Sequence, residues 1–164
     1  MRGSRFVLEV PGYLEGTTEL SANDSSSPEL TGSALNVCAS RLKGLHVLLI
    51  EDDLEAREAI ETQLAEWGVH CSSGVGAEEI GQKMATVSGR TVDRIIADFR
   101  LPGVLQGVDV IQEVRRMLGY SPPAILVSAE VDPERFLAML PPCTVYIQKP
   151  FNAKKLMTLL LGEV

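Results

Sequence analysis

Acidic, hydroxyl and basic side chains stand at the ends of four separate apolar segments of the chain: Glu51 with Asp52, Asp98, Ser128 and Lys149. Carboxylates that gather within a few ångströms repel one another unless a cation compensates their charge. Their oxygens suit a hard divalent ion such as Mg²⁺, which keeps several waters and favours sites with phosphate oxygens. A serine hydroxyl can donate to a phosphoryl oxygen, and a lysine ammonium is a compact positive charge. Together these residue types indicate phosphoryl transfer, in which positioning and charge neutralisation supply most of the catalysis.

Taken one at a time, these residues have ordinary explanations. An isolated carboxylate at a strand end more often caps a helix or lies in solvent, and Asp53 is expected to be such a cap. Ser128 alone would be a turn residue, and Lys149 alone a surface charge. Their placement after four different segments favours a single site, because unrelated surface residues would be scattered over both edges of a sheet.

The segments that must position these residues alternate between strand-like and helix-like patterns. Short apolar runs predict strands at 46–50, 69–72, 92–98, 123–128 and 144–148. Apolar residues at helical spacing and capping residues predict helices at 54–67, 77–87, 108–118 and 132–140, and a last helix from Asn152 through 161. Apolar strands separated by helices predict an α/β fold with a parallel sheet covered on both faces. Ligands bind such sheets beyond the carboxyl ends of the strands, where the polar residues stand.

Composition and charge argue against several classes of function. The 164 residues carry a net charge of −7, which argues against nucleic acid as a direct partner, because phosphate backbones require a basic surface. No apolar run has membrane-spanning length and no secretory signal is evident, so no direct membrane contact is expected. The three cysteines match no zinc spacing and no disulfide framework. They favour a reduced, cytoplasmic setting, with Cys71 and Cys143 as small core residues.

Four stretches, HVLLIEDD, IIADFRLPG, ILVSAE and VYIQKPF, resemble in the same order the signature stretches of response-regulator receiver domains. The resemblance covers residues 45–164 and implies a flavodoxin-like doubly wound (βα)5 three-layer sandwich with strand order 2-1-3-4-5. It implies that Asp98 takes a phosphoryl group from a phosphohistidine of a histidine kinase or a histidine phosphotransfer domain. The module would promote its own phosphorylation and dephosphorylation, and a homodimer is a further candidate assembly.

The resemblance also implies a set of metal ligands. Glu51 and Asp52 would be the acidic pair that binds Mg²⁺ together with Asp98, and the backbone carbonyl of Arg100 would complete the protein's share of the shell. The pair is Glu-Asp rather than the Asp-Asp of many receivers, a variant that still supplies two carboxylates.

Further roles follow from the same resemblance. Lys149 would be the phosphate-sensing lysine, and Ser128 the hydroxyl that contacts the phosphoryl group, with serine in place of the more frequent threonine. Tyr146 would be the switch aromatic that reshapes the surface of the helix at 132–140, the last strand and the last helix. Plain core packing is the alternative role for this tyrosine. Arg100 and Glu130 flank the site and are expected either to pair across its mouth or to stay separately solvated.

The first 44 residues differ in character from the rest and are interpreted as an N-terminal tail and linker. Residues 11–34 are rich in Ser, Thr, Gly, Pro and acids, a composition typical of a flexible linker. Residues 2–11, RGSRFVLEVP, resemble the terminal strand of a histidine-kinase ATP-binding domain, which would make the chain the C-terminal receiver of a hybrid sensor kinase whose parent could be membrane-anchored. Two alternatives stay open: an expression-vector origin for Met-Arg-Gly-Ser, or a tail that alternates by chance.

Two other classes of function compete with the phosphoacceptor. A receiver-like scaffold would bind partners without being phosphorylated and would not need the complete acid set, Ser128 and Lys149. A haloacid-dehalogenase-type phosphatase would need a second aspartate two residues after the nucleophile, and this chain has Arg100 there.

Overall fold

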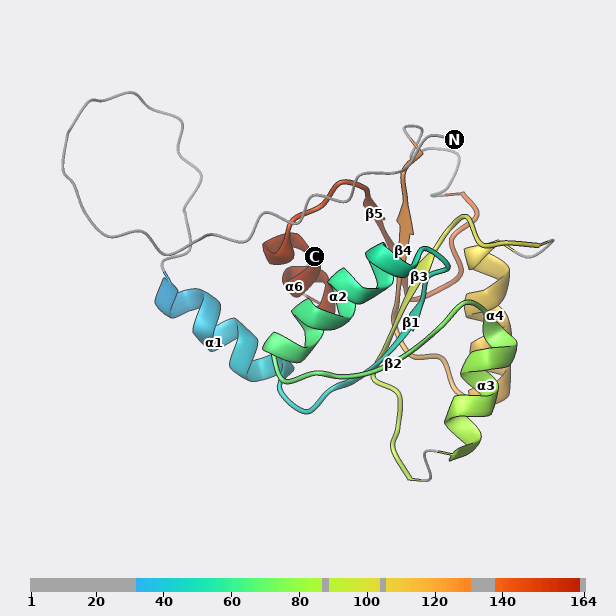
Figure 1. Ribbon diagram of the computed structural model, residues 1–164, viewed down its shortest axis with the longest axis horizontal. Coiled ribbons are helices and arrows are strands. Elements are labelled where there is room, and N and C mark those ends of the chain that lie inside the picture. Colours follow the sequence, from blue (N-terminus) through green and yellow to red (C-terminus); the bar gives the residue numbers. More distant parts are fainter. Residues whose placement is uncertain (1–31, 87–88, 104–105, 131–137, 163–164) are drawn as a thin grey trace.

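Five parallel strands form one sheet in the order β2-β1-β3-β4-β5 (Figure 1). The computed structural model describes residues 32–86, 89–103, 106–130 and 138–162. The strands are β1 (His46–Ile50), β2 (His70–Gly74), β3 (Arg94–Asp98), β4 (Ala124–Ser128) and β5 (Thr144–Gln148). The predicted flavodoxin-like strand order is therefore confirmed, and the strand bounds differ from the predicted ones by at most two residues at either end.

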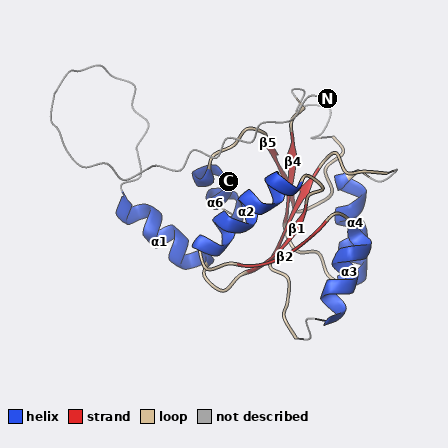
Figure 2. Cartoon of the chain, viewed as in Figure 1, coloured by secondary structure: helices blue, strands red, loops and turns tan. Residues whose placement is uncertain are grey.

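Helices cover both faces of this sheet (Figure 2). On one face lie α3 (Ala77–Thr86) and α4 (Gly107–Leu118), and on the other lie α1 (Gly32–Leu42), α2 (Leu54–Glu66) and α6 (Ala153–Leu161). The helix expected at 132–140 falls for the most part on residues outside the described ones, and residues 138 and 139 form a turn. The described elements build the three layers that the sequence predicted.

Alternate side chains of the strands fill two separate cores, one under each helical layer. On β1, Leu48 packs in the same cluster as Ile80 of α3 and Ile111 of α4, whereas the next residue, Leu49, packs in the cluster that contains Leu64 of α2. Successive strand residues point to opposite faces, so a strand covered on both sides is apolar at every position. Both β1 and β4 are buried along their whole length, as this argument requires.

Two of the predicted helix caps are present. The Asp53 side chain accepts a hydrogen bond from the backbone N–H of Ala56 at 2.9 Å, and the Asn152 side chain accepts one from Lys155 at 2.9 Å. Each cap satisfies a backbone donor that the first helical turn leaves without a partner. Asp53 is therefore a structural residue at the rim of the sheet edge, as expected.

Helix α1 was not predicted, because the sequence analysis assigned residues 1–44 to a tail and linker. The helix packs against α6, and Leu42 is completely buried in the core beneath α2 and α6. Cys38 and Ala39 pack against the same core. Cys38 and Ala39 lie four and three residues before Leu42, so all three share one helix face, a pattern that the polar composition of the preceding segment obscured. Residues 32–42 thus join the folded body, while the helix overlaps the expected linker at 32–34.

The cysteines are placed differently from the expectation in one case. Cys71 is half-buried against the core, and burial raises the pKa of its thiol to about 12. Cys143 was expected in the core but is exposed, because it lies in a turn after Pro141 and Pro142 with a left-handed φ of 54°.

Among the described residues, no helix has the length and apolar character needed to cross a membrane.

Candidate functional site

The carboxyl ends of β1, β3, β4 and β5 bring the predicted site residues to one edge of the sheet. Asp98 and Ser128 are the last residues of β3 and β4, whereas Glu51 and Lys149 directly follow β1 and β5. The parallel register pairs Asp98 with Val127, so the end of β3 lies beside the end of β4. Sheet order and register together bring these side chains, which are far apart in the sequence, close to one another.

Three carboxyl groups gather at this edge. Glu51, Asp52 and Asp98 each place a carboxylate oxygen within 4.8 Å of the others. Glu51 is only 2% exposed and Asp98 9% exposed, whereas Asp52 is exposed to solvent. The backbone N–H of Asp53 donates to Glu51 Oε1 at 3.3 Å, which helps to orient the buried carboxylate. The predicted acidic cluster is therefore present, with one solvent-facing member and two buried members.

The ammonium group of Lys149 bridges the two buried carboxylates. Its Nζ lies 2.8 Å from Glu51 Oε2 and 3.1 Å from Asp98 Oδ1. The Lys149 side chain is 19% exposed, so these pairs are shielded from water far better than surface ion pairs. The lysine predicted to sense phosphate thus lies in direct contact with the predicted acceptor.

Burial and charge together set the protonation of these groups. Burial raises the pKa of Glu51 and of Asp98, and in both cases the Lys149 ammonium acts in the opposite direction. For Lys149 itself burial favours the neutral form, but the hydrogen bond to Glu51 and the two carboxylate charges outweigh it, so the pKa of Lys149 is raised. Lys149 therefore remains a cation and favours the ionised form of both carboxyl groups.

The cluster fits a hard divalent cation. Three carboxylates face a single ammonium group within the described acidic cluster, which leaves negative charge in excess. All available donor atoms are oxygens, which are the ligands that Mg²⁺ prefers in proteins. Asp52 is open to solvent, so a bound ion could retain water molecules on that side.

A hydrogen-bonded group at the mouth of the site joins the loops after β3 and β4. Of the two alternatives for Arg100 and Glu130, the structure shows the ion pair, with Arg100 Nε 3.0 Å from Glu130 Oε1. The Glu130 backbone N–H donates to Ser128 Oγ at 3.1 Å, and the Tyr146 hydroxyl donates to the Glu130 carbonyl at 2.9 Å. Glu130 therefore connects Ser128, the residue predicted to contact the phosphoryl group, with Tyr146, the predicted switch residue. Ser128 is buried and Tyr146 is half-buried.

Gly107 is a site residue that the sequence analysis missed. It begins α4, and its backbone N–H donates to the Phe99 carbonyl at 2.9 Å. A Cβ at this position would lie 2.1 Å from the carbonyl oxygen of Asp98, which no side chain can tolerate. Glycine is therefore required where α4 approaches the end of β3. The only signal in the sequence was a glycine at the start of a predicted helix.

Comparison with known proteins identifies the family to which this architecture belongs. A family model described as the response regulator receiver domain matches residues 47–161. A curated relative, the probable transcriptional regulator ycf29 of Cyanophora paradoxa, is 24% identical over 120 residues. That match covers 72% of this chain and 55% of the relative, so the chain spans about half the length of the curated relative.

Solved structures share the same fold. The receiver domain of the Francisella response regulator 1452 is 23% identical with a TM-score of 0.60, and the match covers 73% of this chain and 95% of that one. A receiver protein from Sinorhizobium medicae WSM419 is 19% identical with a TM-score of 0.62, covering 74% and 94% of the two chains. The chemotaxis protein CheY4 of Vibrio cholerae is 23% identical with a TM-score of 0.60, covering 73% and 98%.

Proposed function

Because the chain belongs to the response regulator receiver domain family, we propose that Asp98 accepts a phosphoryl group from a phosphohistidine of a partner protein. The observation that carries this proposal is the contact of the buried Asp98 carboxylate with the Lys149 ammonium, inside a cluster of three carboxyl groups. One carboxylate oxygen would act as nucleophile, and the ammonium would offset charge on the phosphoryl oxygens.

The acidic cluster would hold Mg²⁺ through Glu51, Asp52 and Asp98, with the backbone carbonyl of Arg100 as a further ligand. When bound, the ion would supply positive charge to the equatorial phosphoryl oxygens. The excess negative charge of the cluster supports this assignment, since a single ammonium compensates only part of it.

The transfer step requires only the phosphohistidine, the Asp98 carboxylate and one proton from solvent. An Asp98 oxygen attacks phosphorus as the P–N bond to the donor imidazole breaks, and the imidazole leaves with the electron pair and takes up a proton. The product is an acyl phosphate on Asp98. Water later attacks the same phosphorus, so that inorganic phosphate leaves and the carboxylate returns. Lys149 holds the phosphoryl oxygens in place during both steps, and the Ser128 hydroxyl donates a hydrogen bond to one of them.

The hydrogen bonds around Glu130 support a conformational switch that responds to phosphorylation of Asp98. Ser128 Oγ accepts from the Glu130 N–H, and Tyr146 donates to the carbonyl of the same residue. Turning Ser128 toward a phosphoryl group would break the first bond and move Glu130, so the hydrogen bond from the Tyr146 hydroxyl to the Glu130 carbonyl would be lost. The proposed switch surface, which consists of β5, α6 and the segment 132–140, would then change shape; residues 132–137 lie outside the described residues.

The partners proposed for this chain are a histidine kinase or a histidine phosphotransfer domain in the cytoplasm. We also propose that the chain is the C-terminal receiver of a hybrid kinase, on the resemblance of residues 2–11, which lie outside the described residues. The direct contact of Lys149 with Asp98 favours a phosphoacceptor over a scaffold, because a scaffold would not require an ammonium beside a buried carboxylate.

The decisive experiment is labelling by acetyl phosphate with Mg²⁺, followed by mass spectrometry of the intact protein. The wild-type chain should gain the mass of one phosphoryl group, and Asp98→Asn should not, because an amide is a poor nucleophile for this step. Asp53→Asn is the matched control, since asparagine can keep the helix cap and Asp53 is no member of the acidic cluster. Undiminished labelling of Asp98→Asn would place the acceptor elsewhere.

A further inference from the structure

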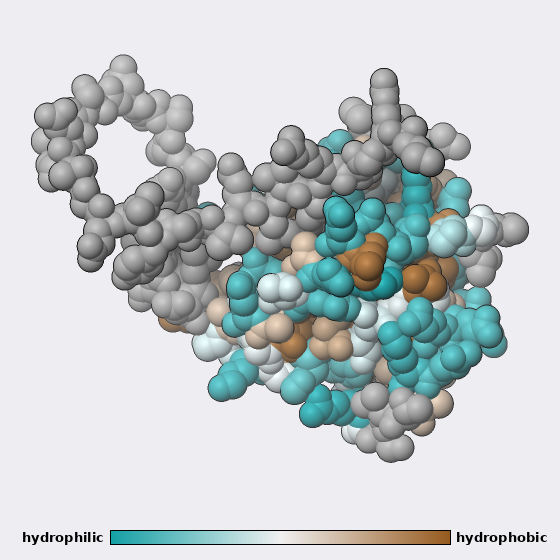
Figure 3. All heavy atoms as spheres, viewed as in Figure 1, coloured by the Kyte–Doolittle hydropathy of each residue, from teal (hydrophilic) through white to brown (hydrophobic). Residues whose placement is uncertain are grey.

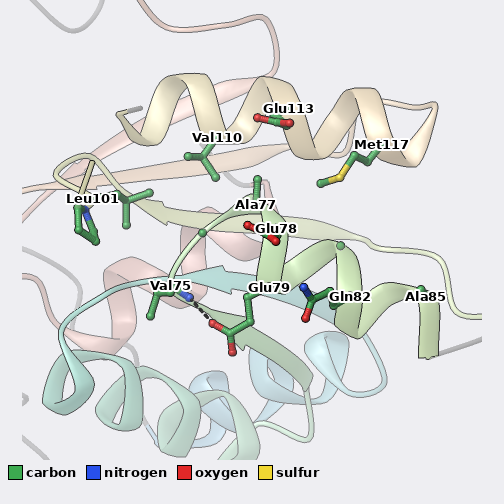
Figure 4. Close-up of a pocket in the computed structure, with 13 residues that line it drawn as sticks. Val75, Ala77, Glu78, Glu79, Gln82, Ala85, Leu101, Val110, Glu113 and Met117 are labelled. Carbon is green, nitrogen blue, oxygen red and sulfur yellow. Dashed lines mark hydrogen bonds between the residues drawn. The ribbon is translucent and has the colours of Figure 1, made fainter. Parts of the chain in front are cut away.

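A groove of about 1030 Å³ runs between α3 and α4, on the helical layer opposite α2 and α6 (Figure 4). Val110 and Met117 project from α4 toward α3, and Leu101 lies at one end, in the loop after β3. A second hollow of about 430 Å³ continues along the same helices, because Gly81, Ala85 and Met117 line both. The groove therefore follows the length of the two helices and lies apart from the acidic cluster.

The groove exists because α3 presents small residues to α4. Ala77, Gly81 and Ala85 recur every four residues and so lie on one face of the helix. The nearest atom to a Cβ built at Gly81 would be Met117 Sδ at 3.3 Å, so any larger residue there would fill the space. Apolar side chains consequently remain in water, with Met117 45% exposed and Val75 43% exposed. Covering them would release water from apolar surface, which is favourable.

This exposed apolar surface contrasts with its surroundings. On the face seen in Figure 3, hydrophilic side chains dominate the described surface and only small apolar patches interrupt them. Single exposed apolar residues are normal on a protein surface, whereas several that line one continuous groove favour a contact there.

The lining of the larger hollow is acidic as well as apolar. It contains Glu78, Glu79 and Glu113 and no basic residue, whereas the smaller hollow contains Arg90. Glu79 is held in place, because it accepts from the Val75 N–H at 3.0 Å and pairs with Lys83 at 2.8 Å. A cationic partner is therefore favoured electrostatically. A second copy that docked through the same face would set glutamates against glutamates, which disfavours a symmetric dimer at this surface.

We propose that this groove binds an amphipathic helix of a partner protein, a helix with basic residues beside its apolar stripe. α4 has 12 residues, which corresponds to about 18 Å at the rise of an α-helix, so the groove accommodates about three turns of a partner. Apolar residues three and four apart would cover Met117 and Val75, and flanking lysines or arginines would face Glu78, whereas Glu113 already pairs with Arg116 at 3.3 Å.

The test uses a synthetic helical peptide of about 14 residues with a leucine stripe flanked by lysines. A matched peptide carries glutamate at every lysine position. Fluorescence anisotropy gives affinities, and amide chemical shifts of the full chain map the contact. The lysine peptide should shift the amides of Val75, Leu101 and Val110, and the glutamate peptide should bind at least about tenfold more weakly.

Two matched substitutions to lysine decide whether the peptide binds in the groove. Met117→Lys places a cation inside the groove and should weaken binding of the lysine peptide at least about tenfold, because it adds like charge and removes apolar contact. Val37→Lys introduces the same charge at a residue of α1 that is 60% exposed and lines neither hollow, and it should leave the affinity unchanged.

Three results would overturn the proposal. The first is equal weakening by both substitutions, which would indicate attraction to overall charge alone. The second is a shift map that lies away from α3 and α4, or no binding of either peptide. The third is self-association that perturbs the same amides without peptide, which would make a second copy the occupant. None of these results bears on the labelling of Asp98.

Discussion

At the scale of single residues, the site depends on how buried charges are balanced. Glu51 and Asp98 are carboxyl groups whose burial favours protonation, and Lys149 is the cation in contact with both. An uncompensated charge in such a place would be strongly unfavourable. The same contact that stabilises the free protein therefore places an ammonium group where a phosphoryl group would be transferred.

Replacing Lys149 with alanine should slow labelling by acetyl phosphate by on the order of 100-fold, because no ammonium then offsets the charge of the phosphoryl oxygens. Mg²⁺ binding, measured by isothermal titration calorimetry, should persist, since every carboxylate remains. Lys154→Ala removes an exposed lysine of α6 and is the matched control. Labelling at the wild-type rate in Lys149→Ala, or a normal conformational response to it, would show that the assigned role is wrong.

Gly107 is a second residue whose identity follows from close packing. Gly107→Ala should lower the free energy of unfolding by about 1–3 kcal/mol, because the new Cβ would meet the Asp98 carbonyl and the backbone must shift. Urea unfolding measures this change. Gly76→Ala serves as control, since a Cβ at Gly76 would have no neighbour within 4 Å. Equal stability of Gly107→Ala and wild type would contradict the close approach of α4 to β3.

At the scale of elements, α1 is the feature that the alternating pattern of strands and helices did not include. It precedes β1, packs against α6, and delivers Leu42 to the core between the sheet and that layer of helices. Its position next to the last helix links the segment upstream of the sheet to α6, one of the elements of the proposed switch surface.

Leu42→Ala should lower the free energy of unfolding by about 2–5 kcal/mol, the range for removing a fully buried leucine side chain from a core. Thermal or urea unfolding would measure it. Val37→Ala, in the same helix, should change the stability by less than about 0.5 kcal/mol, because Val37 is 60% exposed. If both substitutions had equally small effects, α1 would not be part of the cooperative unit.

At the scale of the whole molecule, a buried histidine at the start of β1 should make stability depend on pH. His46 is 4% exposed, and its Nε2 lies 2.9 Å from Ser72 Oγ on β2. Its Nδ1 has no hydrogen-bond partner among the described residues. Burial lowers the pKa of His46 below its usual value of 6.5, although the Thr91 backbone acts against this. The folded protein therefore binds this proton less readily than the unfolded chain does.

The free energy of unfolding should accordingly fall as pH drops below 6.5 toward the folded-state pKa of His46, since the unfolded chain binds more protons in that range. The stability that the neutral His46 side chain contributes is fully present above pH 6.5. Urea unfolding between about pH 5 and pH 8 would show it. His46→Gln should flatten this part of the profile, whereas His70→Gln, at an exposed position, should retain it. Identical profiles for wild type and His46→Gln would contradict the argument.

The elements and the polar strand ends could be read from the sequence because they depend on neighbouring residues. Apolar runs, helical spacing and the caps Asp53 and Asn152 are local features, and the order of the signature stretches indicated the family before any contact was known. These features placed Glu51, Asp98 and Lys149 at strand ends, and the sheet then brought them to one edge.

Only the tertiary structure decided which of these groups touch. Lys149 and Glu51 are 98 residues apart, and their contact depends on strand order and register rather than on local pattern. The same holds for the packing of Leu42 against α6, the exposure of Cys143, and the clash that excludes any side chain at Gly107. Each results from close packing between distant segments, and no single segment of the sequence carries that information.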